Sequence, residues 1–163
     1  MAWEYMEELD YRYVLASLHS DIESEDVIID LCSGNSRFED CLSDNTYYLS
    51  CDLYDERASF NMSDKEFVEE VITQCDVLSL FGYGGFEVDG NPLESSTVLP
   101  SIKYVIDNFE PRTVILESIQ KYVKPLRDIM NGYPNYEISF EYGTNGDIWL
   151  TKRYIMIFKR KEL

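Results

Sequence analysis

Short β-branched runs alternate with helical patterns along most of the chain, and this alternation constrains the fold more than any other feature. The predicted strands are residues 26–31 (DVIIDL), 46–51 (TYYLSC), 58–61, 76–81 (DVLSLF) and 113–117 (TVILE). The predicted helices lie at 36–42, after a capping box formed by Ser63 and Glu66, at 96–109 and at 121–130. Such alternation predicts a doubly wound α/β fold, with a mostly parallel sheet and helices on both faces.

The C-terminal part breaks the alternation. Two long strands, at 136–142 and 153–160, follow each other with no helix between them. Consecutive strands joined by a short loop pair antiparallel, so we expect one antiparallel strand at the C-terminal end of the sheet. With no repeat or linker in the sequence, we expect a single domain over residues 1–163, on which an N-terminal helix within 1–20 packs. Pro100 lies inside a helical pattern, where proline is expected only in the first turn.

The charge is strongly negative and unevenly spread. The chain has 163 residues, with 14 basic and 31 acidic side chains and a formal net charge of −17. The apolar fraction of 45%, with 13 tyrosines, excludes a disordered acidic tail. Residues 103–163 hold 10 of the basic and only 8 of the acidic side chains. A nucleic acid is therefore expected to dock only on this last third, although the acidity also serves solubility.

Neither a membrane segment nor a metal site is expected. No apolar window approaches the length of a membrane span, and the N-terminus lacks the apolar region of a secretory signal, so we predict a cytoplasmic protein. The compact size suits a virus or mobile element, which would place it in the host cytoplasm. The cysteines form no C-x-x-C pair and the single histidine, His19, is read as a residue at a helix C-terminus, so we expect reduced thiols and no metal.

The candidate site follows the first two strands. Asp30 closes the first strand and leads into a turn with a lone glycine, Gly34, where the backbone can approach a ligand closely. Asp52 follows Asp30 by 22 residues and offers a carboxylate to ribose hydroxyls. Cys32 and Ser36 stand where a dinucleotide-binding turn needs glycines, which disfavours a nicotinamide or nucleotide-sugar enzyme.

The turn D-L-C-S-G-N-S, the acidic residue after the second strand and the final antiparallel pair resemble class I S-adenosylmethionine-dependent methyltransferases over about residues 24–160. The resemblance implies a Rossmann-like sheet that binds S-adenosylmethionine. The turn would wrap the methionine and ribose, Asp52 would hold the ribose, and the residue after it would contact adenine. The implied cofactor-binding residues are Asp30, Cys32, Ser33, Gly34, Asp52, Leu53, Asn61, Met62 and Phe81.

Later segments resemble the DNA cytosine-5 methyltransferases. PRTVILESI places Glu117 at that family's glutamate position, and Arg153 matches one arginine of a later motif. Cytosine C5 needs activation by a thiolate, yet the loop 81–86 (FGYGGF) has no Pro-Cys pair, which argues against this chemistry. The candidate catalytic residues are Glu117 and Tyr83. Tyr83 or Phe86 would stack on a flipped base, and the alternative is that these rings form a lid over the cofactor.

Two functions from different classes follow. The first is a minimal methyltransferase whose acceptor is a nucleic acid, a protein or a small molecule. The alternative is a catalytically degenerate protein of the same fold that binds a basic partner, favoured by the missing loop motif and the negative charge. The 13 tyrosines favour an apolar patch through which a homodimer would form.

Overall fold

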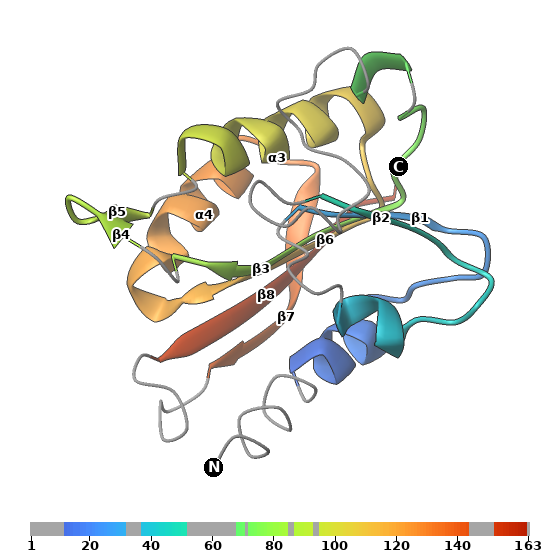
Figure 1. Cartoon of the computed structure of the whole chain (residues 1–163), viewed down its shortest axis with the longest axis horizontal. Coiled ribbons are helices and arrows are strands. Elements are labelled where there is room, and N and C mark those ends of the chain that lie inside the picture. Colours follow the sequence, from blue (N-terminus) through green and yellow to red (C-terminus); the bar gives the residue numbers. More distant parts are fainter. Residues whose placement is uncertain are drawn as a thin grey trace.

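The computed structural model describes residues 12–31, 37–51, 68–70, 72–84, 87–92, 95–143 and 152–162 (Figure 1). Within this part of the chain, six strands form one sheet in the order β2-β1-β3-β6-β8-β7. Their bounds are β1 Val27–Asp30, β2 Tyr47–Ser50, β3 Val77–Tyr83, β6 Thr113–Ile119, β7 Tyr136–Gly143 and β8 Arg153–Arg160. The first four strands in this order are parallel to one another, and β8 runs antiparallel to both β6 and β7. The predicted sheet and its antiparallel strand are confirmed.

Helices cover both faces of this sheet (Figure 1). Helices α3 (Ser95–Phe109) and α4 (Val123–Asn131, after the 3-10 turn η2, Gln120–Tyr122) lie on one face, and their apolar residues form one core cluster with the sheet. A helix over residues 12–19 and the 3-10 helix η1 (Arg37–Cys41) lie on the other face and close a second cluster. All seven residues of β6 are buried, as expected for an interior strand covered on both sides.

Pro100 departs from the expectation for a proline in a helix. It is the sixth residue of α3 and so lies beyond the first turn. Its missing N–H removes one backbone hydrogen bond near the start of the helix, while its exposed ring points away from the core. The buried stripe that includes Val98, Ile102 and Val105 holds the helix on the sheet in spite of this loss.

A small hairpin stands where only a loop was expected. Its strands are β4 (Glu87–Val88) and β5 (Asn91–Pro92), and they pair antiparallel. The two turn residues, Asp89 and Gly90, have φ angles of 53° and 79°, which is the pattern of a type I′ turn. The Asp-Gly dipeptide is the sequence signal for this turn, and the short flanking strands explain why the sequence alone did not predict a hairpin.

Some predicted elements fall partly or wholly outside the described residues. The predicted strand at 58–61 and the capping box at Ser63 and Glu66 lie outside them. Of the helix after that box, residues 68–70 are helical, and Ile72 is buried. The element predicted at 36–42 is the 3-10 helix η1 rather than an α-helix.

His19 is the last residue of the helix 12–19, is exposed, and stacks on Phe140 with ring centroids 3.9 Å apart. None of the described helices has the length and apolar character that crossing a membrane requires. Within the described residues, no group of histidine, cysteine and carboxylate side chains is arranged to hold a metal ion.

Candidate functional site

The strand order reverses between β1 and β3. From β1 the chain goes to β2 on one side of the sheet, whereas β3 and the later strands lie on the other side. Ligands of open parallel sheets bind at such a reversal, beyond the carboxyl ends of the strands. In this protein those ends are Asp30 in β1, the segment after Phe81 in β3, and Glu117 in β6.

The end of β1 is tied to both neighbouring strands. The carboxylate of Asp30 is buried and accepts a hydrogen bond from the hydroxyl of Tyr48 in β2. The Leu31 amide donates to the carbonyl of Ser79 at 2.9 Å, and the Cys51 amide donates to the carbonyl of Asp30 at 2.8 Å. The two segments predicted to hold the cofactor follow Leu31 and Cys51. Both segments therefore begin next to Asp30.

Most of the predicted cofactor residues cannot be placed in this geometry. Those outside the described residues are Cys32, Ser33, Gly34, Asp52, Leu53, Asn61 and Met62. Their roles remain predictions. Asp30 is described and is the last residue of β1, which agrees with its predicted place at the end of the first strand, and the strand order reverses beside it.

The end of β3 is irregular and rich in glycine. The pairing register with β6 shifts between Leu80 and Tyr83, and Gly82 and Gly84 both have positive φ angles, of 81° and 83°. A Cβ atom on Gly84 would lie 2.4 Å from the Cδ2 atom of Tyr122, so only glycine fits there. The backbone of residues 82–84 therefore follows a path that its glycines and their neighbours define.

Two aromatic rings predicted to face the ligand are core residues. The Phe81 ring is buried against Tyr13 at 4.7 Å and Phe38 at 4.9 Å between centroids. The Tyr83 ring is 1% exposed and packs edge-on against Tyr122 on the opposite face of the sheet. Stacking on a flipped base needs an open ring face, so the placement of Tyr83 does not support the catalytic role predicted for it.

Glu117 lies at the centre of a buried charged group. One carboxylate oxygen, Oε2, accepts the Gly82 amide at 2.5 Å. The other, Oε1, accepts Arg153 Nε at 3.0 Å and lies 2.6 Å from Arg12 Nη1. Glu117 is 0% exposed, Arg12 3% and Arg153 9%. We call Arg12, Glu117, Arg153 and the Gly82 amide the Glu117 cluster.

The contacts of this cluster favour orientation over proton transfer. A buried carboxylate is stable only when charges or hydrogen bonds compensate its lost hydration, and Glu117 has both kinds of partner. With both oxygens engaged and no exposed surface, Glu117 does not present its carboxylate to a substrate. Its predicted catalytic role stays a prediction, whereas its contact with Arg153 brings together two residues that the sequence had singled out separately.

Sequence reasoning missed Arg12 and Tyr48. Arg12 is the only basic residue in the first 36 positions, and it lies on the apolar helical pattern, which is a signal for a buried ion pair. Tyr48 gave no such signal, because its partner Asp30 comes from a different strand.

Comparison with known proteins gives matches in structure alone, since no family model and no curated protein sequence matches the chain. A precorrin-6y C5,15-methyltransferase from Geobacter metallireducens aligns with a TM-score of 0.62 and 10% identity, over 92% of this chain and 87% of its own. An rRNA methylase from Streptococcus thermophilus aligns with a TM-score of 0.62 and 12% identity, over 94% and 95%.

TrmK from M. capricolum, in complex with S-adenosyl-homocysteine, aligns with a TM-score of 0.61 and 15% identity, over 93% of this chain and 69% of its own. At such identities a likeness concerns the course of the backbone and not the chemistry. Together with the observed strand order and the antiparallel β8, these matches show that the chain has the fold of the class I S-adenosylmethionine-dependent methyltransferases.

Proposed function

We propose that the protein is an S-adenosylmethionine-dependent methyltransferase that binds its cofactor beyond the carboxyl ends of β1 and β2. The observation that carries this proposal is the reversal of strand order at Asp30, in a sheet that aligns over more than nine tenths of the chain with methyltransferases. One of these carries S-adenosyl-homocysteine. The position of Leu31 and Cys51 beside Asp30 supports it further, because both segments assigned to the cofactor begin there.

Within this proposal each residue has a defined task. The turn 32–36 lets its backbone approach the cofactor, and Asp52 accepts hydrogen bonds from the ribose hydroxyls. Leu53 lies against the adenine, and Asn61 with Met62 lies at the adenine edge. Asp30, held by Tyr48, fixes the start of the turn. S-adenosylmethionine supplies an electrophilic methyl group, and its cationic sulfonium suits an acidic edge of the sheet.

The acceptor that we favour is a nucleic acid. The neighbours include methylases whose substrates are named as rRNA and tRNA. In this chain, η2 and α4 follow directly on the carboxyl end of β6 and carry the exposed cations Lys121 and Lys124 and the partly exposed Arg127. We propose that the acceptor docks on this less acidic part of the surface. Alignment of the methyl donor with an electron-rich acceptor then supplies much of the rate.

Calorimetry with S-adenosyl-homocysteine tests the cofactor site. We expect the purified protein to bind it, and Asp52→Ala to weaken binding about 10- to 100-fold, because charge-assisted hydrogen bonds to the ribose are lost. Asp44→Ala is the matched control, since Asp44 is exposed after η1 and has no proposed contact with the cofactor. An absence of binding by the unaltered protein at millimolar ligand would reject the proposal.

A second candidate is a protein of this fold that binds a basic partner and transfers no methyl group. The contacts that close off Glu117, together with the net charge of −17, favour it. Incubation with tritiated S-adenosylmethionine and total RNA or cell protein separates the two candidates. Methyl incorporation that is lost in Asp52→Ala supports the enzyme. Cofactor-independent co-purification of a basic protein, with no incorporation, supports the second candidate.

A further inference from the structure

The helix 12–19 runs along β6 in the opposite direction. Its first described residue, Arg12, contacts Glu117 near the carboxyl end of β6. The carbonyl of Ser20, just after the helix, accepts a hydrogen bond from Thr113 Oγ1 at the start of the strand. Four strand steps span about 13 Å and eight helical steps about 12 Å, so the two elements match in length. The helix therefore delivers Arg12 to the edge of the sheet where the ligand site is proposed.

The Glu117 carboxylate joins this helix to the irregular end of β3. Its Oε1 faces the two guanidinium groups, and its Oε2 faces the Gly82 amide. Arg153 belongs to β8, whose position is fixed by seven register pairs with β6, whereas Arg12 comes from an element outside the sheet. The orientation of the carboxylate thus depends on where the helix lies.

The orientation of the Glu117 carboxylate fixes the backbone at Gly82. Its φ angle of 81° is in the left-handed region, and its amide turns toward Glu117 at the point where the ladder register between β3 and β6 shifts. Without that acceptor, a partly buried N–H would lose this partner and the path of residues 82–84 would no longer be fixed.

We propose that Arg12 is a positioning residue for the methyl-transfer site. Acting through Glu117, it fixes the Gly82 amide and with it residues 82–84, at the carboxyl edge of the sheet where the cofactor is proposed to bind. The expected effect on methyl transfer rests on the proposed function, whereas the contact between Arg12 and Glu117 does not. A displacement of about 1 Å in such a loop is enough to reduce methyl transfer about 100-fold.

Arg12→Met is the variant that separates the helix from the cluster. Methionine keeps much of the volume of arginine, and the remaining Glu117–Arg153 pair leaves the buried carboxylate compensated. Arg12→Lys keeps the charge but loses the fork of the guanidinium, so it covers the case in which the methionine variant does not fold. Val14→Ala is the matched control, because Val14 lies in the same helix and is 41% exposed.

Amide hydrogen exchange, followed by NMR, is the deciding measurement. In Arg12→Met we expect the Gly82 amide to exchange at least 10-fold faster, with the amides of β1 and of the first half of β6 within twofold of their original rates. We expect Arg12→Lys to accelerate Gly82 by less than threefold, and Val14→Ala to leave it unchanged. An unchanged Gly82 rate in Arg12→Met, or equal acceleration throughout the sheet, overturns the proposal, since the latter is loss of stability alone. If Arg12→Met does not fold, Arg12→Lys decides instead: acceleration of the Gly82 amide alone supports the link, whereas no acceleration, or equal acceleration throughout the sheet, overturns it.

Binding of S-adenosyl-homocysteine keeps this inference distinct from the proposed function. If the unaltered protein does not bind the ligand, the proposed function fails, while the exchange result still decides the link between Arg12 and Gly82. If it binds, we expect Arg12→Met to bind within threefold, because the residues assigned to the adenosine follow β1 and β2. Where methyl transfer to RNA is detected, kcat should fall at least 10-fold with KM for the cofactor within threefold, and a rise in KM alone would contradict positioning.

Discussion

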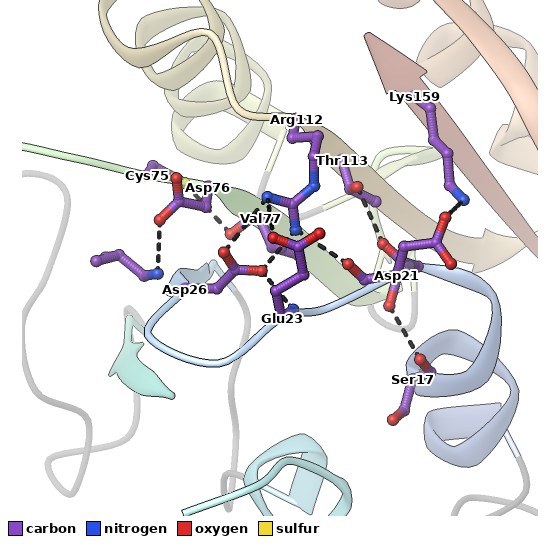
Figure 2. Close-up of polar contacts among 12 residues, drawn as sticks. Ser17, Asp21, Glu23, Asp26, Cys75, Asp76, Val77, Arg112, Thr113 and Lys159 are labelled. Atoms are coloured by element: carbon purple, nitrogen blue, oxygen red, sulfur yellow. Dashed lines mark hydrogen bonds and ion pairs between the residues drawn. The ribbon is translucent and has the colours of Figure 1, made fainter. Parts of the chain in front are cut away.

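Two arginine–carboxylate clusters lie at opposite ends of β6, and they differ in burial. The amino-end cluster consists of Arg112, Asp26, Glu23, Asp21 and Lys159 (Figure 2). Its Arg112 Nη2 donates to Asp26 Oδ2 at 2.6 Å and to the Asp21 carbonyl at 3.0 Å. Arg112 is 32% exposed and Glu23 71%, whereas the residues of the Glu117 cluster are almost wholly buried.

This difference in burial means that similar ion pairs have different effects on stability and geometry. In the amino-end cluster water and salt screen the charges, so the ion pairs add little beyond the hydrogen bonds that hold the loop 21–26 on the sheet. Asp21 and Glu25 in that loop have positive φ angles, which these contacts compensate. The Glu117 cluster gains little net free energy from its charges but loses much if the shared carboxylate is removed, so its benefit is a fixed geometry.

The largest effect is expected from Glu117→Ala. Removing the carboxylate leaves two buried guanidinium groups and the Gly82 amide without it, which costs about 3–5 kcal/mol in the free energy of unfolding. Urea unfolding followed by circular dichroism measures it. The triple variant Arg12→Met, Glu117→Leu, Arg153→Met should recover most of the loss, and a triple variant as unstable as the single one would contradict this account.

Gly84→Ala tests the loop beside the Glu117 cluster. The new Cβ would lie 2.4 Å from Tyr122 Cδ2, at a φ angle of 83°, so we expect a loss of about 2–4 kcal/mol from overpacking and backbone strain. Gly90→Ala is the control, because Gly90 has a φ angle of 79° but a Cβ added there would meet no heavy atom of the described residues within 4 Å. It should lose only about 1 kcal/mol. Equal losses would show that strain alone, and not the Tyr122 contact, selects glycine at position 84.

Asp26→Asn weakens the amino-end cluster. Asp26 Oδ2 accepts both the Glu23 amide at 2.7 Å and Arg112, and the hydrogen bond to Asp26 raises the pKa of Arg112. We expect a loss of about 1–3 kcal/mol in unfolding free energy at low salt. The loss should shrink in 1 M salt, because the arginine is partly exposed, while the effect of Glu117→Ala should not. Equal salt dependence of the two variants would remove the distinction between the clusters.

The buried thiol of Cys75, next to Asp76 and beside the amino-end cluster (Figure 2), should make the stability of the protein depend on pH. Burial raises the pKa of its thiol from 9.0 to about 12. As the pH rises, the unfolded chain releases this proton at a lower pH than the folded protein does. The free energy of unfolding should therefore fall by about 1.4 kcal/mol per pH unit between pH 9 and pH 12. Urea unfolding at pH 8, 9 and 10 measures the slope. Cys75→Ala should reduce the slope between pH 9 and 10, and an unchanged slope would assign it to other groups.

The smallest effect is expected from Lys159→Met. The Lys159–Asp21 ion pair lies at the rim of the amino-end cluster, where Asp21 is 68% exposed. We expect a change of about 0.2–1 kcal/mol, vanishing in high salt. A loss as large as that of Asp26→Asn would show that the rim, and not the Asp26–Arg112 contact, holds the loop.

Prediction from the sequence succeeded where a property is local. The apolar runs of β1, β3 and β6 show their strands directly, since an interior strand needs apolar side chains on both faces. The strand pair β7 and β8 was readable because no helical pattern separates the two. The position of Asp30 at the end of the first strand follows from the same apolar run, whereas the strand order came only from the structure.

The side-chain partners at the site were not readable. Phe81 and Tyr83 look like ligand residues in a glycine-rich loop, but they pack into cores on opposite faces of the sheet. Arg12 and Glu117 are 105 positions apart, and only the antiparallel docking of the helix on β6 brings them together. Local sequence thus determined the six strands of the main sheet and the antiparallel pair among them. Tertiary structure decided which charges are buried together, because burial and its electrostatic cost depend on which elements pack face to face.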